Sequence, residues 1–163
     1  MEAVVIESKK LIRFQDCDPF NHLNNGKYFD YFMNAREDHL RKHYNFDIYK
    51  HALKTGESWL VTNSQIAYLS PAFLMEEVVI QSKFLEWNPK DILVEMQMWN
   101  NEKTKLKSLL WTRFAHFNLR TQQSIAHSSY INEVFGITGL PFEKHSSFNQ
   151  RIKDVKKTGA VMN

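Results

Sequence analysis

Apolar and polar residues alternate along most of the chain after residue 58, and this period-2 pattern is typical of β-strands. The alternation covers residues 59 to 69, 78 to 84, 92 to 98 and 106 to 119. Ser70-Pro71 ends the first run, and the turn Asn88-Pro89-Lys90-Asp91 separates the second from the third. Because short turns join antiparallel neighbours, we predict three or four long strands in an antiparallel meander.

In the first third of the chain, the spacing of apolar residues changes from the two-residue period of a strand to the period of a helix. Residues 3 to 15 predict a long strand, or a strand with an irregularity near Ser8-Lys9-Lys10. From Asn24 or Asn25, both good helix N-caps, apolar side chains recur at helical spacing. The first half of this helix is apolar around most of its circumference, which indicates a helix wrapped by other structure. Residues 36 to 43 turn polar, and we expect them to emerge into solvent before a loop around residues 51 to 58.

The order strand, long helix, several strands predicts an α+β fold. The simplest packing is an antiparallel sheet of about five strands wrapped around one long central helix. A length of 163 residues suits one domain and is short for two. We expect residues 1 to 163 to form that domain, with residues 140 to 163 as a polar tail or a short terminal helix.

Composition and charge exclude several classes of protein. No segment approaches the ~18 consecutive apolar residues of a membrane span. The start of the chain lacks the pattern of a secretory signal, and the single cysteine, Cys17, excludes an internal disulfide framework, so we expect a cytoplasmic protein. A net charge of +3, with basic residues spread along the chain, does not indicate a nucleic-acid partner.

The loop between the predicted strand and helix carries the groups that can act on a carbonyl: Asp16, Asp18, His22, Asn24 and Asn25. Asp18 precedes the helix start by six residues, so its carboxylate can reach over the helix N-terminus. There the backbone N–H groups of Asn25 and Gly26 lack intrahelical acceptors and can polarise a carbonyl oxygen. A carboxylate beside such donors is the equipment for hydrolysing an acyl compound.

Each of the other polar groups has a simpler structural interpretation. We expect Asp16 to fix the loop and Asn24 to cap the helix, while His22 either positions water or holds the loop. Cys17 lies between two acids, which oppose formation of a thiolate. His39 and His43 share a helix face, but no glutamate follows His39 as in zinc peptidases, and we expect no metal site. The chain also lacks a Gly-x-Ser-x-Gly elbow and a phosphate-binding glycine loop.

The run Asp16-Cys-Asp-Pro-Phe-Asn-His-Leu-Asn-Asn25, followed by Tyr28, resembles the active-site signature of the hotdog-fold acyl-CoA thioesterases of the 4-hydroxybenzoyl-CoA thioesterase superfamily. This form resembles the long-chain acyl-CoA and acyl-carrier-protein branches of the superfamily more than its aromatic branch. The resemblance implies that Asp18 is the catalytic carboxylate, as nucleophile or general base, supported by His22. It also implies that backbone N–H groups near Asn25 bind the thioester oxygen and that Tyr28 lines the acyl pocket.

Weaker similarity continues through Tyr68-Leu-Ser-Pro71 and Glu77-Val78. In the 4-hydroxybenzoyl enzymes, a turn near the position of Lys90 carries positive charge for the phosphates of coenzyme A. Two neighbouring positions are Asn88 and Pro89 here, so only Lys90 can take that role.

The resemblance predicts an acyl-CoA or acyl-carrier-protein thioesterase that needs no cofactor, because coenzyme A is part of the substrate. It implies a homodimer or a dimer of dimers, since the active sites of the family form between subunits. Two alternatives remain at this point: a non-catalytic acyl-CoA-binding protein, and an acyl-thioester hydratase or dehydratase. The latter enzymes place their His at a different spacing from the acid, and His22 is one residue too far along.

Overall fold

The computed structural model describes residues 4–137 and 144–160. Its strands are β1 (Ile6–Leu11), β2 (Glu57–Tyr68), β3 (Glu77–Trp87), β4 (Asp91–Asn100), β5 (Leu106–Asn118) and β6 (Gln123–Ser124). They form one antiparallel sheet in the order β1-β3-β4-β5-β2, with the two-residue β6 paired to β5. The strands β3, β4 and β5 are the predicted meander, and β1 is shorter than predicted because residues 14–16 form a 3₁₀ turn.

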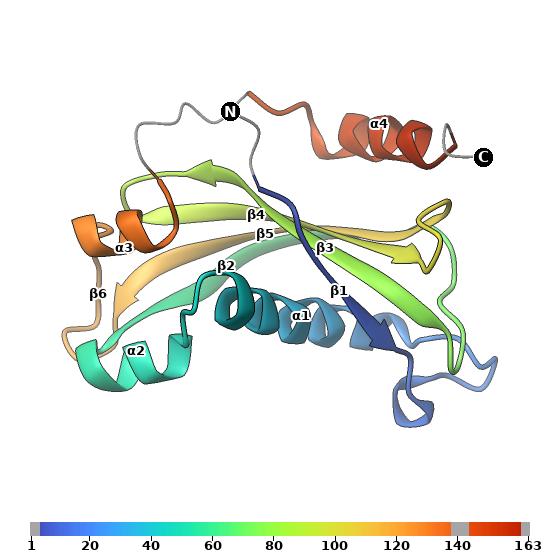
Figure 1. Cartoon of the computed structure of the whole chain (residues 1–163), viewed down its shortest axis with the longest axis horizontal. Helices are drawn as coiled ribbons and strands as arrows, with labels where there is room; N and C mark the ends of the chain where they lie inside the picture. Colours follow the sequence, from blue (N-terminus) through green and yellow to red (C-terminus); the bar gives the residue numbers. More distant parts are fainter. Residues whose placement is uncertain (1–3, 138–143, 161–163) are drawn as a thin grey trace.

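The long helix α1 (Tyr28–His43) lies across one face of the curled sheet (Figure 1), and the predicted hotdog arrangement is confirmed. Its side chains Phe32 and Ala35 are fully buried among residues of β3, β4 and β5. The prediction that residues 36 to 43 emerge into solvent is wrong for three of them, because Arg36, His39 and Leu40 are buried. The polar pattern there reflects buried polar groups with specific neighbours.

Two short helices lie where none was expected. The helix α2 (Ile48–Thr55) occupies most of the expected loop around residues 51 to 58. The side chain of Asp47 accepts hydrogen bonds from the first N–H groups of α2, and Gly56 ends it with a φ of 77°. The second is α3 (Ser129–Val134), capped by Ser128. Both are too short for a clear helical period, so only their caps signal them.

The helix α4 (Phe148–Ala160) lies across the opposite face of the sheet from α1 (Figure 1). Val155 of α4 is buried against a second apolar cluster, which includes Trp99 and Trp111. Residues 148 to 160, expected as a polar tail or a short terminal helix, therefore form a helix that packs on the outer face. No helix in the described part of the chain is long and apolar enough to cross a membrane.

Candidate active site

The loop between β1 and α1 folds back on itself and holds Asp18 in place. Residues 17 and 23 form an isolated antiparallel bridge, and the N–H of Asp18 donates to the carbonyl of His22 at 2.8 Å. Oδ1 of Asp18 accepts hydrogen bonds from the backbone N–H groups of Phe20 at 2.9 Å and His22 at 3.1 Å. Oδ2 accepts no hydrogen bond from any residue that the structure describes. One oxygen thus orients the carboxylate, while the other is left for a substrate or water.

The side chain of Asp16 ties this loop to α1. Its Oδ2 accepts the hydroxyl of Tyr31 at 2.8 Å, and its carbonyl accepts the N–H of Asn24 at 2.9 Å. Burial raises the pKa of Tyr31 to about 12, so the hydroxyl stays a donor at neutral pH. Asp16 has the loop-fixing contacts predicted for it, and these come from its carboxylate as well as from its backbone.

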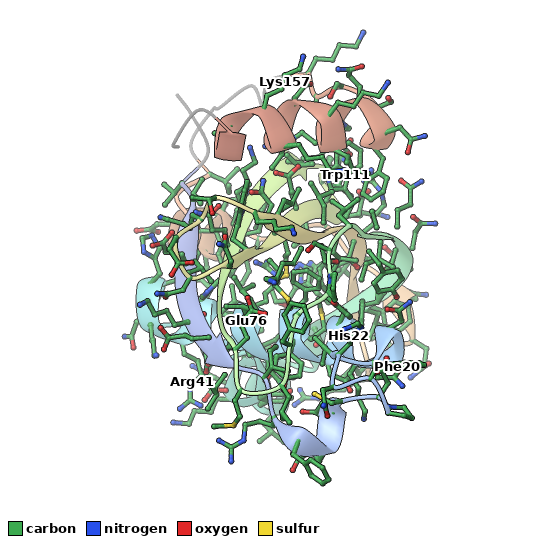
Figure 2. All side chains as sticks on the ribbon, turned by 90° about the vertical axis from the view of Figure 1, so that its right-hand side faces the viewer. Phe20, His22, Arg41, Glu76, Trp111 and Lys157 are labelled. Carbon is green, nitrogen blue, oxygen red and sulfur yellow. The ribbon has the colours of Figure 1, made fainter. Side chains whose placement is uncertain are left out.

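The backbone of His22 holds the loop through both of its hydrogen bonds with Asp18. The imidazole lies edge-on to Phe73, with ring centres 5.1 Å apart, and is tilted against Phe20 at 6.5 Å. Figure 2 shows Phe20 and His22 at the same end of the molecule. Among the described residues, neither ring nitrogen has a hydrogen-bond partner. The contacts favour the structural role for the backbone of His22, and a supporting role of its ring stays a prediction.

The helix start offers one free amide where two were predicted. Residues Asn25–Lys27 form a 3₁₀ turn before α1, and Asn24 caps this turn. Oδ1 of Asn24 accepts the N–H of Gly26 at 2.9 Å, so the Gly26 amide is occupied, contrary to the prediction. The N–H of Asn25 has no acceptor within the described segments, and the hydroxyl of Tyr68 donates to the carbonyl of Asn25 at 3.1 Å. The candidate oxyanion donor is therefore the amide of Asn25.

The structure places Tyr28 in the core. It is 2% exposed, its hydroxyl accepts the N–H of Ala72 at 3.3 Å, and its ring lies edge-on to Tyr68. Burial raises the pKa of this hydroxyl. The contacts join the start of α1 to the segment between β2 and β3, and they favour a structural role. A place for Tyr28 in the wall of an acyl pocket stays a prediction.

Lys90 lies far from the other predicted site residues. It is exposed in the turn between β3 and β4, whereas the loop that holds Asp18 follows β1, whose last residue pairs with the first residue of β3. The 11 residues of β3 separate the two ends by roughly 30 Å. Within one chain, the structure therefore brings Asp18, His22 and Asn25 together and leaves Lys90 apart.

Neither a reactive thiol nor a metal cluster accompanies this loop. Partial burial, and then the charges of Asp16 and Asp18, raise the pKa of Cys17, which opposes formation of a thiolate as predicted. No group of three or more His, Cys, Asp and Glu side chains in the described ranges has an arrangement suited to a metal ion. His39 instead lies between the hydroxyls of Ser82 at 2.7 Å and Ser8 at 2.9 Å.

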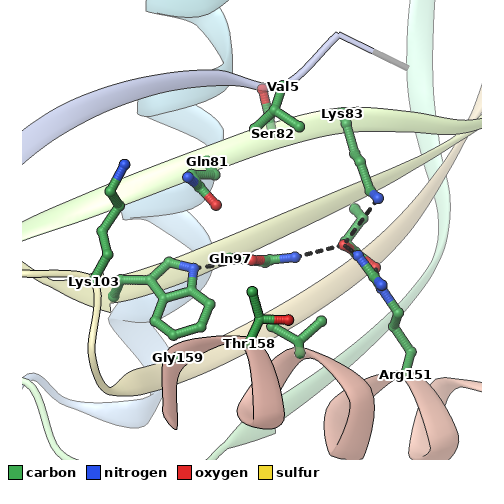
Figure 3. Close-up of a pocket in the computed structure, with 12 residues that line it drawn as sticks. Val5, Gln81, Ser82, Lys83, Gln97, Lys103, Arg151, Thr158 and Gly159 are labelled. Carbon is green, nitrogen blue, oxygen red and sulfur yellow. Dashed lines mark hydrogen bonds and ion pairs between the residues drawn. The ribbon is translucent and has the colours of Figure 1, made fainter. Parts of the chain in front are cut away.

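Sequence reasoning missed two cavities. One, of about 260 Å³, lies between α1, α2 and the sheet and contains Arg36. A signal was present, because Arg36 stands four residues after Phe32 and four before Leu40, on the buried face of the helix. The other cavity, also of about 260 Å³, lies under α4 on the outer face (Figure 3). Its walls come from segments distant in the sequence, and no local pattern indicates it.

Comparison with known proteins agrees with the fold. The family model of the thioesterase-like superfamily matches residues 12–151. The long-chain acyl-CoA thioesterase FadM of Escherichia coli (strain K12) is 24% identical over 122 residues, which are 75% of this chain and 90% of the relative.

Solved structures with the same fold include the following two. YbaW of Escherichia coli, described as a probable thioesterase, superposes with a TM-score of 0.69 at 23% identity, over 78% of this chain and 94% of the other. The 1,4-dihydroxy-2-naphthoyl-CoA thioesterase Slr0204 of Synechocystis superposes with a TM-score of 0.74 at 9% identity, over 85% of this chain and all of the other. At these identities the superpositions show the fold alone.

Proposed function

The chain belongs to the thioesterase-like superfamily, and on this basis we propose that it hydrolyses acyl-CoA thioesters to a free acid and coenzyme A. Relatives named for the hydrolysis of long-chain acyl-CoA and of a naphthoyl-CoA support an acyl-CoA substrate. An acyl group on a carrier protein has the same reacting bond and belongs to the same proposal. The observation that carries it is the loop that fixes one oxygen of Asp18 and leaves the other free, just before a helix start with an unpaired amide at Asn25.

In the proposed reaction, the N–H of Asn25 donates to the thioester oxygen and stabilises the negative charge that develops on it. Oδ2 of Asp18 either removes a proton from the attacking water or attacks the carbonyl carbon itself. The second route forms a mixed anhydride that water then hydrolyses. In both routes the carbon–sulfur bond breaks and the sulfur leaves with a proton as coenzyme A. A positioned base commonly contributes about 100- to 10,000-fold in rate, and one such donor about 100- to 1000-fold.

The test is release of free thiol from a panel of acyl-CoAs by the wild type and by Asp18→Asn. Asparagine keeps an Oδ1 acceptor for the amides of Phe20 and His22, so the loop should keep its shape while the base is lost. We expect kcat to fall at least about 100-fold. Asp30→Asn is the matched control, because Asp30 is exposed in the first turn of α1 and its ion pair with Lys27 is 3.6 Å long.

Three results would contradict the proposal. An Asp18→Asn variant as fast as the wild type would remove Asp18 from the reaction. A wild type that binds acyl-CoA but releases no thiol would be a binding protein. Conversion of an enoyl-CoA to a hydroxyacyl-CoA without thiol release would indicate a hydratase. Single turnover in labelled water then tests for the nucleophilic route: label in the Asp18 carboxylate requires an anhydride that water hydrolyses at the carboxyl carbon of Asp18.

The partners that we propose follow from the edges of the sheet. On its open side β2 has no neighbour within the described structure, and its residues 60–65 are exposed. A long open edge tends to pair with another strand, so we propose a homodimer in which two β2 edges pair antiparallel. A further dimer of dimers belongs to the same expectation. We propose no nucleic-acid partner and no cofactor, and the single cysteine favours the cytoplasm as the compartment.

A further inference from the structure

The cavity between α1, α2 and the sheet has the walls of a small-molecule site. Its volume of about 260 Å³ is close to the lower end of the ~300–1,000 Å³ range of ligand pockets. Aromatic side chains from three strands and two loops line it: Phe46, Trp59, Phe84, Trp87, Phe114 and Phe135. The lining also includes Val61 and Tyr49, which are 47% and 62% exposed, so the cavity is reached from the side of β2 and α2.

Arg36 places a positive charge inside these aromatic walls. The residue is 8% exposed, and its guanidinium carbon lies 5.0 Å from the centre of the Phe84 ring and 5.7 Å from that of Phe114. Its N–H groups make no hydrogen bond or ion pair with any residue in the described ranges. The ring faces attract the cation but supply no lone pairs, so its five N–H donors have no protein acceptor within the described ranges.

The neighbouring charges do not supply the missing acceptor. Glu37 is the acidic side chain of the lining, and its carboxylate accepts the hydroxyl of Tyr49. Burial lowers the pKa of Arg36 to about 10, so the guanidinium still carries its charge at neutral pH. A buried charge without a hydrogen-bonded partner is unfavourable, and a planar carboxylate that accepts two parallel N–H bonds is the acceptor that fits a guanidinium best.

We propose that this cavity binds an amphipathic carboxylate, with its hydrocarbon part among the aromatic side chains and its carboxylate on Arg36. Such a ligand has two possible sources. It can be an acyl group of the thioester substrate that carries a second carboxylate at its far end, and this form rests on the proposed function. It can also be a free carboxylic acid, such as a reaction product, and this form does not depend on catalysis.

Binding is tested first without turnover. Octanoate is titrated into the wild type by calorimetry and by the fluorescence of Trp59 and Trp87, with octanol as the uncharged probe. We expect octanoate to bind the wild type about 10- to 100-fold more tightly than it binds Arg36→Met, and octanol to bind both proteins equally. Arg36→Lys, which keeps the charge but not the planar fork, should fall between the two.

Two controls exclude a general loss of charge and a loss of folding as causes of weaker binding. Arg41→Met removes an exposed arginine of the same helix, whose nearest acid lies 4.0 Å away, and should bind octanoate like the wild type. Methionine fills most of the space of the buried arginine, and circular dichroism and thermal unfolding test whether Arg36→Met is folded. If octanoate binds Arg36→Met as tightly as it binds the folded wild type, or binds the wild type no more tightly than octanol does, the proposal is wrong.

Turnover then separates the two sources. Suberoyl-CoA and octanoyl-CoA have the same chain length and differ in the distal carboxylate. If the carboxylate is part of the substrate, Arg36→Met lowers kcat/KM for suberoyl-CoA about 10- to 100-fold more than it lowers kcat/KM for octanoyl-CoA. If the ligand is a free acid, octanoate inhibits the wild type and not the variant, and suberoyl-CoA has no advantage. An inactive wild type that still binds octanoate through Arg36 would refute the proposed function and support this site.

Discussion

The ion pair between Glu95 and Arg151 joins α4 to the outer face of the sheet, and its removal is the sharpest test of that packing. Glu95 is 1% exposed on β4. Arg151 donates to both of its oxygens, at 2.8 and 2.7 Å, and Gln97 donates at 2.6 Å (Figure 3). Trp111 donates to the same carboxylate at 2.9 Å. The carboxylate is therefore charged, buried and almost fully hydrogen-bonded.

We predict that Arg151→Met lowers the free energy of unfolding by about 2 to 3 kcal/mol at pH 7. Removing one partner of a buried ion pair commonly costs about 3–5 kcal/mol, because the other charge stays buried. The effect should be smaller here for two reasons. The Arg151 side chain is 26% exposed, and Lys83 remains 3.8 Å from Glu95 in addition to the bonds from Trp111 and Gln97.

The predicted loss depends on pH, and the sign follows from the pKa of Glu95. In the wild type, burial alone would raise this pKa. Hydrogen bonds from Arg151 and Trp111 have the opposite and larger combined effect, so the pKa lies below its ordinary value of 4.5. The pair therefore stabilises the fold above about pH 4.5, and this stabilisation is lost as the pH falls through the folded pKa. Without Arg151, burial dominates and the pKa rises, so the variant gains stability relative to the wild type as the carboxylate takes up a proton.

The assay is urea unfolding of both proteins at pH 7 and near pH 4. The difference in free energy should shrink at the lower pH, and Glu95→Gln combined with Arg151→Met should be more stable than Arg151→Met alone at pH 7. Lys153→Met, an exposed position of α4, serves as the control. A loss that is equal at both pH values, or no loss at all, would refute the reasoning that a buried charge joins α4 to the sheet.

Two further predictions concern the buried histidine and the sheet edge. Burial and then the charge of Arg36 lower the pKa of His39 from 6.5 to about 4, so the unfolded chain binds a proton at this residue that the folded chain does not. The contribution of His39 to the free energy of unfolding should fall by about 3 kcal/mol between pH 6.5 and 4, and His39→Gln should remove this part of the pH dependence in urea unfolding. Light scattering should give two or four times the 19.3 kDa of one chain. Ser64→Pro and Gln65→Pro test the sheet edge, because the N–H groups of neighbouring residues on β2 point to opposite sides. Proline should dissociate the dimer at the position whose N–H points outward and destabilise the fold at the other position. A dimer that stays intact in both folded variants would exclude pairing through β2.

The predicted fold follows from periods that single segments carry by themselves. The alternation in β3, β4 and β5 and the apolar breadth of α1 are local properties, and they suffice for a sheet around a helix. The burial of polar side chains, in contrast, depends on residues that are distant in the sequence. Arg36 is buried because Phe84 and Phe114 lie over it, and His39 because Ser8 and Ser82 reach it, and all four partners lie on strands far away in the sequence.

The candidate site was predictable to the extent that its contacts are short in sequence. The bonds of Asp18 to Phe20 and His22 span two and four residues, so a loop-fixed carboxylate could be foreseen. The prediction for Gly26 was wrong because the cap residue Asn24 has a side-chain oxygen that competes for the same amide. The position of Lys90 depends on the length of β3 and on strand order, which a turn motif does not contain.

The proposed dimer gives the Arg36 cavity a relation to catalysis that one chain lacks. Along α1, Arg36 lies 11 residues beyond Asn25, about 16 Å at the helical rise. Ser58 and Trp59, at the beginning of β2, line the cavity, while Tyr68 at the end of β2 holds the carbonyl of Asn25. Antiparallel pairing of two β2 edges needs a two-fold axis perpendicular to the sheet. This axis keeps both α1 helices on the same face of the joined sheet. It also places the beginning of one β2 beside the end of the other. The cavity of one protomer would then open beside the partner subunit's Asn25, and an acyl chain bound to that amide could extend directly toward Arg36.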